Sequence, residues 1–164
     1  MRAAPPPGTN PLLRLAQLGQ SLWYDYITRD LLASGSLARL ISEDGLSGMT
    51  SNPTIFEKAI AGSRLYDEDM RRLAELGRGA ADIFETLAVA DVQAACDAFM
   101  PQYRQTAAAG FVSLEVSPTL ANDAEGTVQE AERLWRAVGR PNAMIKFPAR
   151  EQRSRPSGTL LPAA

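Results

Sequence analysis

Four short apolar segments alternate with longer helical segments, and this alternation limits the folds open to the chain more than any other feature. The segments expected to form strands are residues 21–27, 46–51, 111–116 and 143–147. The segments whose apolar residues recur at helical spacing are residues 11–20, 28–44, 54–77, 81–109 and 127–138. Strand–helix alternation predicts a parallel α/β sheet flanked by helices, either a (β/α) barrel or a doubly wound sheet.

The number of repeated units indicates how much of a barrel is present. A complete eight-stranded TIM-type barrel needs about 250 residues, whereas this chain has 164. We therefore expect about four of the eight β/α units, carried by residues 11–149. We interpret residues 1–10 as a disordered leader and residues 150–164, which show no periodic pattern, as a disordered tail.

Residue usage excludes several kinds of catalytic site. The chain contains no histidine and only one cysteine, Cys96. Ser–His and Cys–His dyads and an intrachain disulfide are therefore excluded, and a metal centre is not expected. Any acid–base chemistry must use carboxylates, lysine, tyrosine or bound water.

Charge and hydropathy bear on partners and location. Seventeen basic and nineteen acidic side chains give a formal charge of −2, without a run of like charges. This pattern does not indicate binding to nucleic acid or to an anionic membrane surface. No apolar stretch reaches the roughly 18 residues of a membrane-spanning helix, and the first ten residues lack the apolar region of a secretory signal. We expect a cytoplasmic protein.

Four polar residues stand at or near the ends of the expected strands: Asp25, Asn52, Glu115 and Lys146. In a barrel, the carboxyl ends of the strands form the rim where active sites assemble. We therefore expect these four side chains to converge at one end of the sheet and to point toward the barrel interior.

Lysine is rare in this chain, since fifteen of the seventeen cations are arginine and only Lys58 and Lys146 are lysine. Lys146 lies in the apolar segment Ala-Met-Ile-Lys-Phe-Pro, where an ammonium group must either pair with a carboxylate or give up its proton more readily. A lysine so placed can form an imine with a ketone. Lys58, on a charged helix, is expected at the surface.

Structural explanations for the same residues remain open. Lys146 could be an ordinary ion-paired strand end, and Glu115 and Asp25 could each hydrogen-bond a loop or pair with an arginine. Asn52 precedes Pro53 and is by itself a good turn residue. Three aromatic residues are expected in the core: Trp23, Tyr24 and Trp135.

Four sequence blocks resemble the transaldolase family, in its order and spacing. They are Trp-Tyr-Asp at 23–25, Gly-Met-Thr-Ser-Asn-Pro-Thr-Ile-Phe at 48–56, Ser-Leu-Glu-Val at 113–116 and Asn-Ala-Met-Ile-Lys-Phe-Pro at 142–148. The resemblance covers residues 12–149. The chain is most similar in character to the longer bacterial type, which is sometimes fused to a glucose-6-phosphate isomerase domain.

The resemblance implies a role for each strand-end residue. Lys146 would be the Schiff-base nucleophile, Asp25 the acid–base group during carbon–carbon cleavage, and Glu115 the partner of a bound water during imine formation and hydrolysis. Asn52 would hold substrate hydroxyl groups. The family transfers a dihydroxyacetone unit from sedoheptulose 7-phosphate to glyceraldehyde 3-phosphate in the pentose phosphate pathway, with no metal or organic cofactor.

The resemblance stops after Ala149. The family continues with four more strands, which bring a threonine, a serine and the phosphate-binding arginine to the site. We interpret residues 150–164 as a tail of the kind that a frameshift produces. The alternative function is therefore a catalytically inactive, truncated fragment or pseudogene product. Its open sheet edges would lead it to associate with another copy or another chain.

Overall fold

The computed structural model describes residues 10–106, 108–120 and 122–147. Within these ranges, one sheet of four parallel strands has the order β1-β2-β3-β4. The strands are β1 (Leu22–Tyr24), β2 (Leu46–Thr50), β3 (Phe111–Glu115) and β4 (Ala143–Lys146). Neighbours in sequence are neighbours in the sheet, so the arrangement is that of a partial α/β TIM-type barrel, as the alternation predicts.

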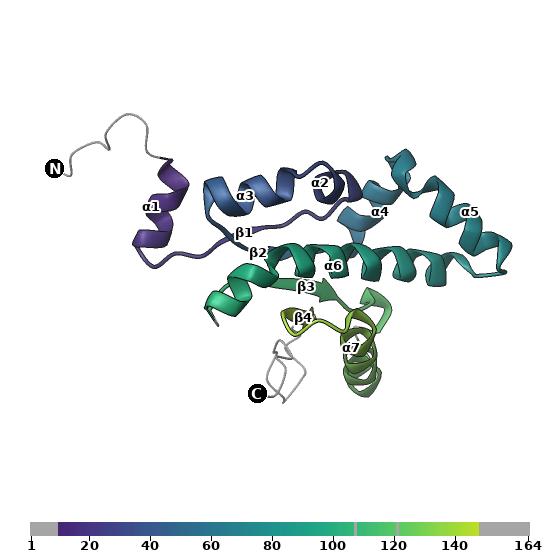
Figure 1. Ribbon diagram of the computed structural model, residues 1–164. Coiled ribbons are helices and arrows are strands. Elements are labelled where there is room, and N and C mark those ends of the chain that lie inside the picture. The colour runs from purple at the N-terminus through teal and green to yellow at the C-terminus, as the bar shows by residue number, and fades with distance from the viewer. Residues whose placement is uncertain (1–9, 107, 121, 148–164) are drawn as a thin grey trace.

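The strands are connected by helices, as Figure 1 shows. Those before β3 are α1 (Pro11–Gln17), α2 (Arg29–Ala33), α3 (Ser36–Asp44), α4 (Pro53–Ala61), the 3₁₀ helix η1 (Arg64–Tyr66), α5 (Asp67–Glu75) and α6 (Ala80–Gln105). After β3 come the 3₁₀ helix η2 (Pro118–Leu120) and α7 (Ala124–Val138). Two expected breaks are confirmed: the break at Gly35, which separates α2 from α3, and the one near Gly62, at which α4 ends.

Side-chain caps explain where several helices begin. The hydroxyl group of Thr28 accepts a hydrogen bond from the backbone N–H of Leu31 at the start of α2. The carboxylate of Asp123 accepts one from Gly126 and starts α7, three residues before the expected position. Such caps satisfy backbone donors that the first turn of a helix leaves free. Gly139 ends α7 with φ 57°, in the left-handed region that favours glycine.

The main core lies between the sheet and the helices α3, α6 and α7. Val112 and Leu114 of β3 and Val116, which directly follows the strand, alternate and are at most 5% exposed. They belong to one hydrophobic cluster with residues of α6 and α7. Figure 1 shows α6 lying along β3. The intervening residues Ser113 and Glu115 point to the other face, so the expected alternation is confirmed.

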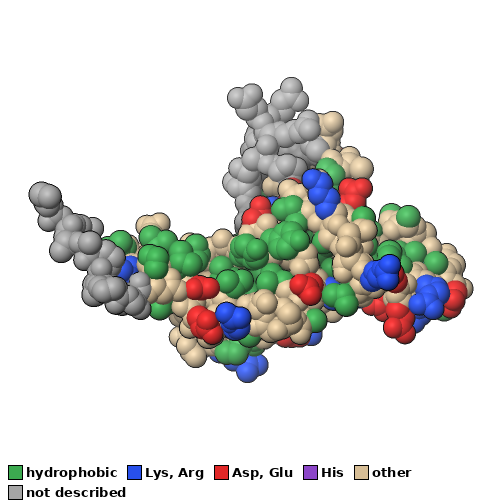
Figure 2. Space-filling model, turned by 90° about the horizontal axis from the view of Figure 1, so that it is seen from above, with side chains coloured by type: hydrophobic (Ala, Val, Ile, Leu, Met, Phe, Trp, Pro, Cys, Tyr) green, Lys and Arg blue, Asp and Glu red, His purple; other side chains and the backbone are tan. Residues whose placement is uncertain are grey.

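The expectation of core positions was wrong for two of the three aromatic residues. Trp23 and Tyr24 are 38% and 40% exposed, whereas Trp135 packs against the core. Both exposed residues lie in β1, and no described strand pairs with its outer edge. Leucines of α1 and the residue after it are exposed as well. Figure 2 shows apolar side chains across the middle of one face.

Asn142 joins three elements just before β4. Its side chain is fully buried, and its Nδ2 group donates to the carbonyl oxygens of Cys96 (2.9 Å) and Gly110 (2.8 Å). The backbone carbonyl of Asn142 in turn accepts from the N–H of Val112. The start of β4 is thereby fixed to α6 and to the start of β3.

The expected leader and tail fall largely outside the described residues. Of residues 1–10, only Asn10 is described, and its Oδ1 atom accepts from the N–H of Leu12 as the cap of α1. Residues 150–164 are not described at all. Within the described ranges, no helix has both the length and the hydropathy needed to cross a bilayer.

Candidate active site

Lys146 is the last residue of β4, and its ammonium group meets three oxygen atoms. The Nζ atom lies 3.1 Å from Oε2 of Glu115, and it donates to the hydroxyl of Thr50 (3.3 Å) and to the carbonyl of Ser51 (3.1 Å). The lysine side chain is 40% exposed. It therefore pairs with a carboxylate, as its apolar segment led us to expect, and part of its side chain remains exposed.

Glu115 faces Lys146 because the two strands are in register. Glu115 of β3 pairs directly with Lys146 of β4, and adjacent parallel strands place such side chains on the same face. The side chain of Glu115 is 21% exposed. An ion pair of this exposure contributes at most about 1 kcal/mol to stability. Its geometry, with a proton acceptor beside an amine, is therefore its more informative property.

Two hydroxyl groups in the site were not singled out from the sequence as functional. Thr50 Oγ1 accepts from Lys146 and also from the hydroxyl of Ser113, at 2.9 Å. With two donors directed at this oxygen, the proton of Thr50 is left to donate elsewhere. Both hydroxyl groups could have been predicted from the sequence, because Thr50 lies in the Thr-Ser-Asn-Pro block and Ser113 shares a face with Glu115.

Asn52 follows β2 at the same end of the sheet, and the structure shows it as a helix cap. Its Oδ1 atom accepts from the N–H of Thr54 at 2.9 Å and starts α4 ahead of Pro53. Asn52 therefore has the structural role at the turn that its place before Pro53 suggested. The Nδ2 group has no hydrogen-bond partner among the described residues and can donate to a ligand.

Asp25 directly follows β1, one position beyond the last paired residue, Tyr24. Since all four strands are parallel, Asp25 lies at the same edge of the sheet as the other three candidates. Its side chain is exposed and has no hydrogen-bond or ion-pair partner among the described residues. The structure thus brings Lys146 and Glu115 into contact, and leaves Asp25 near the same rim without a contact to either.

Other possible reactive groups are poorly placed. Cys96 is buried in α6, and burial raises the pKa of its thiol to about 12. A thiol held protonated in this way is a poor nucleophile. Within the described ranges, no group of three or more Cys, Asp or Glu side chains is arranged to hold a metal ion.

Lys58 is exposed, as expected, and lies beside a hollow that begins at the carboxyl end of β1. The hollow has a volume of about 280 Å³ and is lined by residues that include Tyr24, Tyr26, Asp30 and Lys58. Lys146, Glu115 and Asp25 do not line it. The two lysines therefore lie in different surroundings, and only Lys146 is held against a carboxylate by the sheet.

Comparison with known proteins agrees with this arrangement. The sequence model of the transaldolase/fructose-6-phosphate aldolase family matches residues 22–155. The chain is 46% identical over 141 residues to a transaldolase of Trichodesmium erythraeum, which covers 85% of this chain and 37% of that protein.

Two further relatives give the same result. A transaldolase of Thiobacillus denitrificans is 50% identical over 138 residues, covering 82% of this chain and 38% of its own length. A transaldolase of Neisseria meningitidis serogroup C / serotype 2a is 50% identical over 133 residues, covering 80% and 38%. The chain thus spans somewhat over a third of the length of these relatives. Its sheet of parallel strands, its strand-end lysine and these matches lead to one conclusion: the chain belongs to the transaldolase/fructose-6-phosphate aldolase family.

Proposed function

We propose that this chain carries the imine-forming half of a transaldolase active site. In a complete barrel, the site would transfer a dihydroxyacetone unit from sedoheptulose 7-phosphate to glyceraldehyde 3-phosphate, as a step of the pentose phosphate pathway in the cytoplasm. The observation that supports this most is the placement of Lys146 Nζ, 3.1 Å from the carboxylate of Glu115 on the neighbouring strand.

The contacts of Lys146 suit imine formation. The amine attacks the ketose carbonyl to give a carbinolamine, which loses water to become an iminium ion. Glu115, through a bound water, carries the protons that this step moves. The same pair can return water when the imine is hydrolysed. Carboxylate-assisted proton transfer of this kind contributes about 10²- to 10⁴-fold in rate.

Carbon–carbon cleavage requires a second base. In this proposal Asp25 takes the proton of the C4 hydroxyl group, the bond between C3 and C4 breaks, and the aldose phosphate leaves. The bonding electrons enter the iminium group, so a three-carbon enamine stays on Lys146. The free Nδ2 group of Asn52 would hold hydroxyl groups of this unit.

The alternative proposal is a catalytically inactive fragment that associates with itself through the open half-barrel. It is supported by the sheet edges at β1 and β4, which pair with no other described strand. Catalysis by positioning fails when substrate-holding groups are missing, and large losses of rate then follow. The two proposals differ in turnover and agree on the family.

Trapping with borohydride tests the imine-forming site directly. The chain is incubated with fructose 6-phosphate, reduced and digested, and the labelled peptide is identified by mass spectrometry. We expect the label on Lys146, its loss in Lys146→Ala, and its retention in the matched variant Lys58→Ala. A label on Lys58, or one that persists in Lys146→Ala, would contradict the assignment.

A further inference from the structure

Nothing at the side chain of Asp25 explains how this residue is held in place. The strand β1 has only three residues, and its last backbone pairing joins Tyr24 to Met49. Asp25 lies beyond that pairing, exposed and without a described polar partner. Its position is therefore set by the backbone on both sides, which means by β1 before it and by the segment leading into α2 after it.

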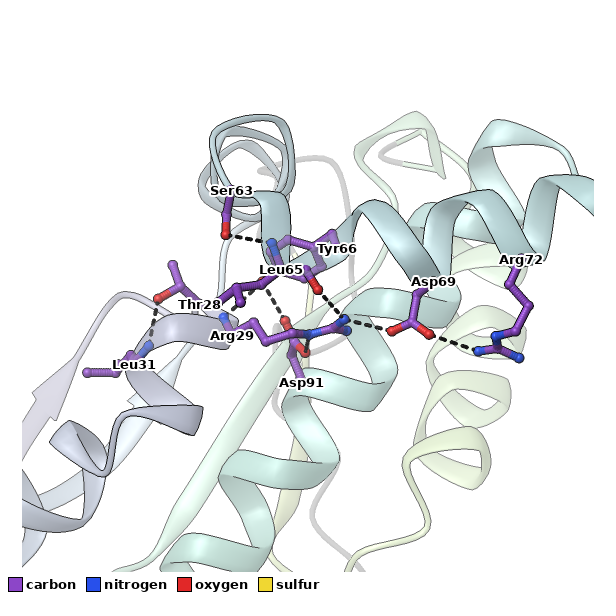
Figure 3. A network of polar contacts seen from close by, with 9 residues as sticks. All are labelled: Thr28, Arg29, Leu31, Ser63, Leu65, Tyr66, Asp69, Arg72 and Asp91. Carbon is purple, nitrogen blue, oxygen red and sulfur yellow. Dashed lines mark hydrogen bonds and ion pairs between the residues drawn. The ribbon is translucent and has the colours of Figure 1, made fainter.

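That following segment is fixed by a buried polar cluster, which Figure 3 shows in detail. The hydroxyl of Tyr66 accepts from the backbone N–H of Arg29 (2.9 Å) and donates to Oδ2 of Asp91 (2.6 Å). The Nε group of Arg29 donates to Oδ1 of the same carboxylate at 3.1 Å. Asp91 thus holds Arg29 twice, directly through the side chain and through Tyr66 at the main chain. We call Arg29, Tyr66 and Asp91 the Arg29 clamp.

Two of the three residues of the Arg29 clamp are closed to water, whereas the side chain of Arg29 is partly exposed. Tyr66 is fully buried and Asp91 is 3% exposed. The guanidinium group of Arg29 also lies over the ring of Tyr66, 4.3 Å from its centre. Burial raises the pKa of the Asp91 carboxyl, although hydrogen bonds from Tyr66 and Arg29 favour its charged form. Buried ion pairs of this kind add little net stability, whereas they restrict geometry strongly.

The clamp also connects to the strand that carries Glu115. Asp91 belongs to α6, which packs against β2 and β3. A continuous path of contacts therefore runs from the backbone of Arg29, through Tyr66 and Asp91, to the sheet. This path fixes the segment after Asp25 relative to the strand of Glu115, and through the next pairing relative to Lys146.

We propose that Tyr66 and Asp91 are positioning residues that hold Asp25 at the rim where it can act on a substrate bound to Lys146. This inference rests on the proposed function of Asp25. It predicts that loosening the Arg29 clamp impairs the step that needs Asp25, carbon–carbon cleavage, and spares imine formation, which needs Lys146 and Glu115.

The two steps leave adducts of different mass on Lys146. With fructose 6-phosphate, borohydride reduction gives a six-carbon adduct before cleavage. It gives a three-carbon adduct after C3–C4 cleavage has released glyceraldehyde 3-phosphate and the enamine has taken a proton at C3. The quantity to compare is the three-carbon share, meaning the fraction of all labelled Lys146 that carries the three-carbon adduct. We expect Tyr66→Phe, in the full chain, to lower this share at least about tenfold while the total label changes less than twofold. An unchanged share would overturn the proposal.

Two reference variants separate the possible failures. Asp25→Asn should abolish the three-carbon share; if it does not, the proposed function of Asp25 is wrong, whatever Tyr66→Phe does. Leu87→Ala removes a buried neighbour of Tyr66 in the same hydrophobic cluster and leaves the Arg29 clamp intact. A loss of share in Leu87→Ala equal to that in Tyr66→Phe would mean that general destabilisation is the cause, and would also overturn the proposal.

Amide hydrogen exchange tests the positioning role of Tyr66 without any adduct. It therefore decides the proposal even if no adduct forms on Lys146. We expect Tyr66→Phe to speed exchange across residues 25–29 at least about tenfold. The matched variant Asp69→Asn removes the outer ion pair of Arg29 and the pair of Asp69 with Arg72, and leaves the Arg29 clamp itself in place. Because the Asp69 side chain is 36% exposed, this variant should have a much smaller effect. Unchanged exchange in Tyr66→Phe, or equal acceleration in Asp69→Asn, would refute the clamp.

Discussion

The indole ring of Trp23 lies directly on Gly48 in the neighbouring strand. A Cβ atom added to Gly48 would sit 2.6 Å from Cε2 of the ring, closer than side chains can approach. Gly48 pairs with Trp23 in the sheet, so the missing side chain of one residue makes room for the large side chain of the other. This contact explains why a glycine occupies the middle of a strand, where it is otherwise unfavourable.

Gly48→Ala should therefore displace Trp23 and destabilise the sheet by about 1–3 kcal/mol, the usual result of overfilling a packed site. Unfolding in urea measures the change, and a red shift in tryptophan emission would report the displaced ring. Gly79→Ala is the control, because Gly79 has φ −73° and nothing within 4 Å of the added atom. Equal effects in the two variants would contradict the explanation.

Glu115→Gln should slow the labelling of Lys146 by fructose 6-phosphate about 10²-fold or more, because the amide cannot accept the protons that imine formation moves. The rate of borohydride-trapped adduct formation measures this. Glu132→Gln, which removes an exposed carboxylate paired with Arg136 on α7, serves as the control. Labelling at the same rate in Glu115→Gln and the unaltered chain would exclude Glu115 from the reaction.

Stability should decline at alkaline pH because of Tyr66. Burial and the hydrogen bond to Asp91 raise the pKa of Tyr66 above its ordinary value of 10.0. A raised pKa in the folded state means that the contribution to stability is complete below about pH 10 and is lost as pH rises toward the folded value. Above pH 10 the unaltered chain should lose about 1.4 kcal/mol per pH unit more than Tyr66→Phe does.

Urea unfolding at several pH values between 8 and 11 measures that difference in slope. Tyr66→Phe will start from a lower stability at pH 8, since Asp91 loses a buried donor. The comparison therefore concerns slopes and not absolute values. Tyr26→Phe, at an exposed tyrosine, should keep the slope of the unaltered chain. Parallel declines in the chain and in Tyr66→Phe would show that the Tyr66 hydroxyl is not responsible.

Self-association is expected for the isolated chain at micromolar concentration. Apolar side chains such as Leu18 (60% exposed) and Trp23 (38% exposed) lie on its surface, and the outer edges of β1 and β4 pair with no other described strand. Exposed edges and apolar patches favour association. Sedimentation should show dimers or larger species, and Trp23→Lys should reduce them more than Arg104→Lys, a control at an exposed residue of α6. A clean monomer would contradict this prediction.

Much of the fold was predictable because its signals are local. Glycines at 35 and 139, Pro53 after Asn52, and the alternation of Val112, Leu114 and Val116 each act within a few residues, and the structure confirms them. The exposure of Trp23 and Tyr24 was not predictable in this way. A large aromatic residue in a strand is usually buried, and only the position of β1 at the sheet edge, a property of the whole topology, reverses that expectation.

In the candidate site, too, the contacts that depend on local sequence were predictable and those that depend on the whole topology were not. The contact of Lys146 with a carboxylate followed from its apolar segment and from strand alternation. The Arg29 clamp did not, because Arg29, Tyr66 and Asp91 are separated by 37 and 25 residues along the chain. No periodicity or motif connects them. Only the packing of α2, η1 and α6 against one another brings them together.

The buried amide of Asn142 has a consequence for the order of folding. Its two hydrogen bonds, to Cys96 and Gly110, close chain segments of 46 and 32 residues at once. Closing such segments costs conformational entropy before the contacts repay it, so pairings of this kind form slowly. On the ribosome, Asn142 is synthesised after all of α6 and β3. The nascent chain therefore contains α6 and the start of β3 before it can fix the start of β4 through Asn142.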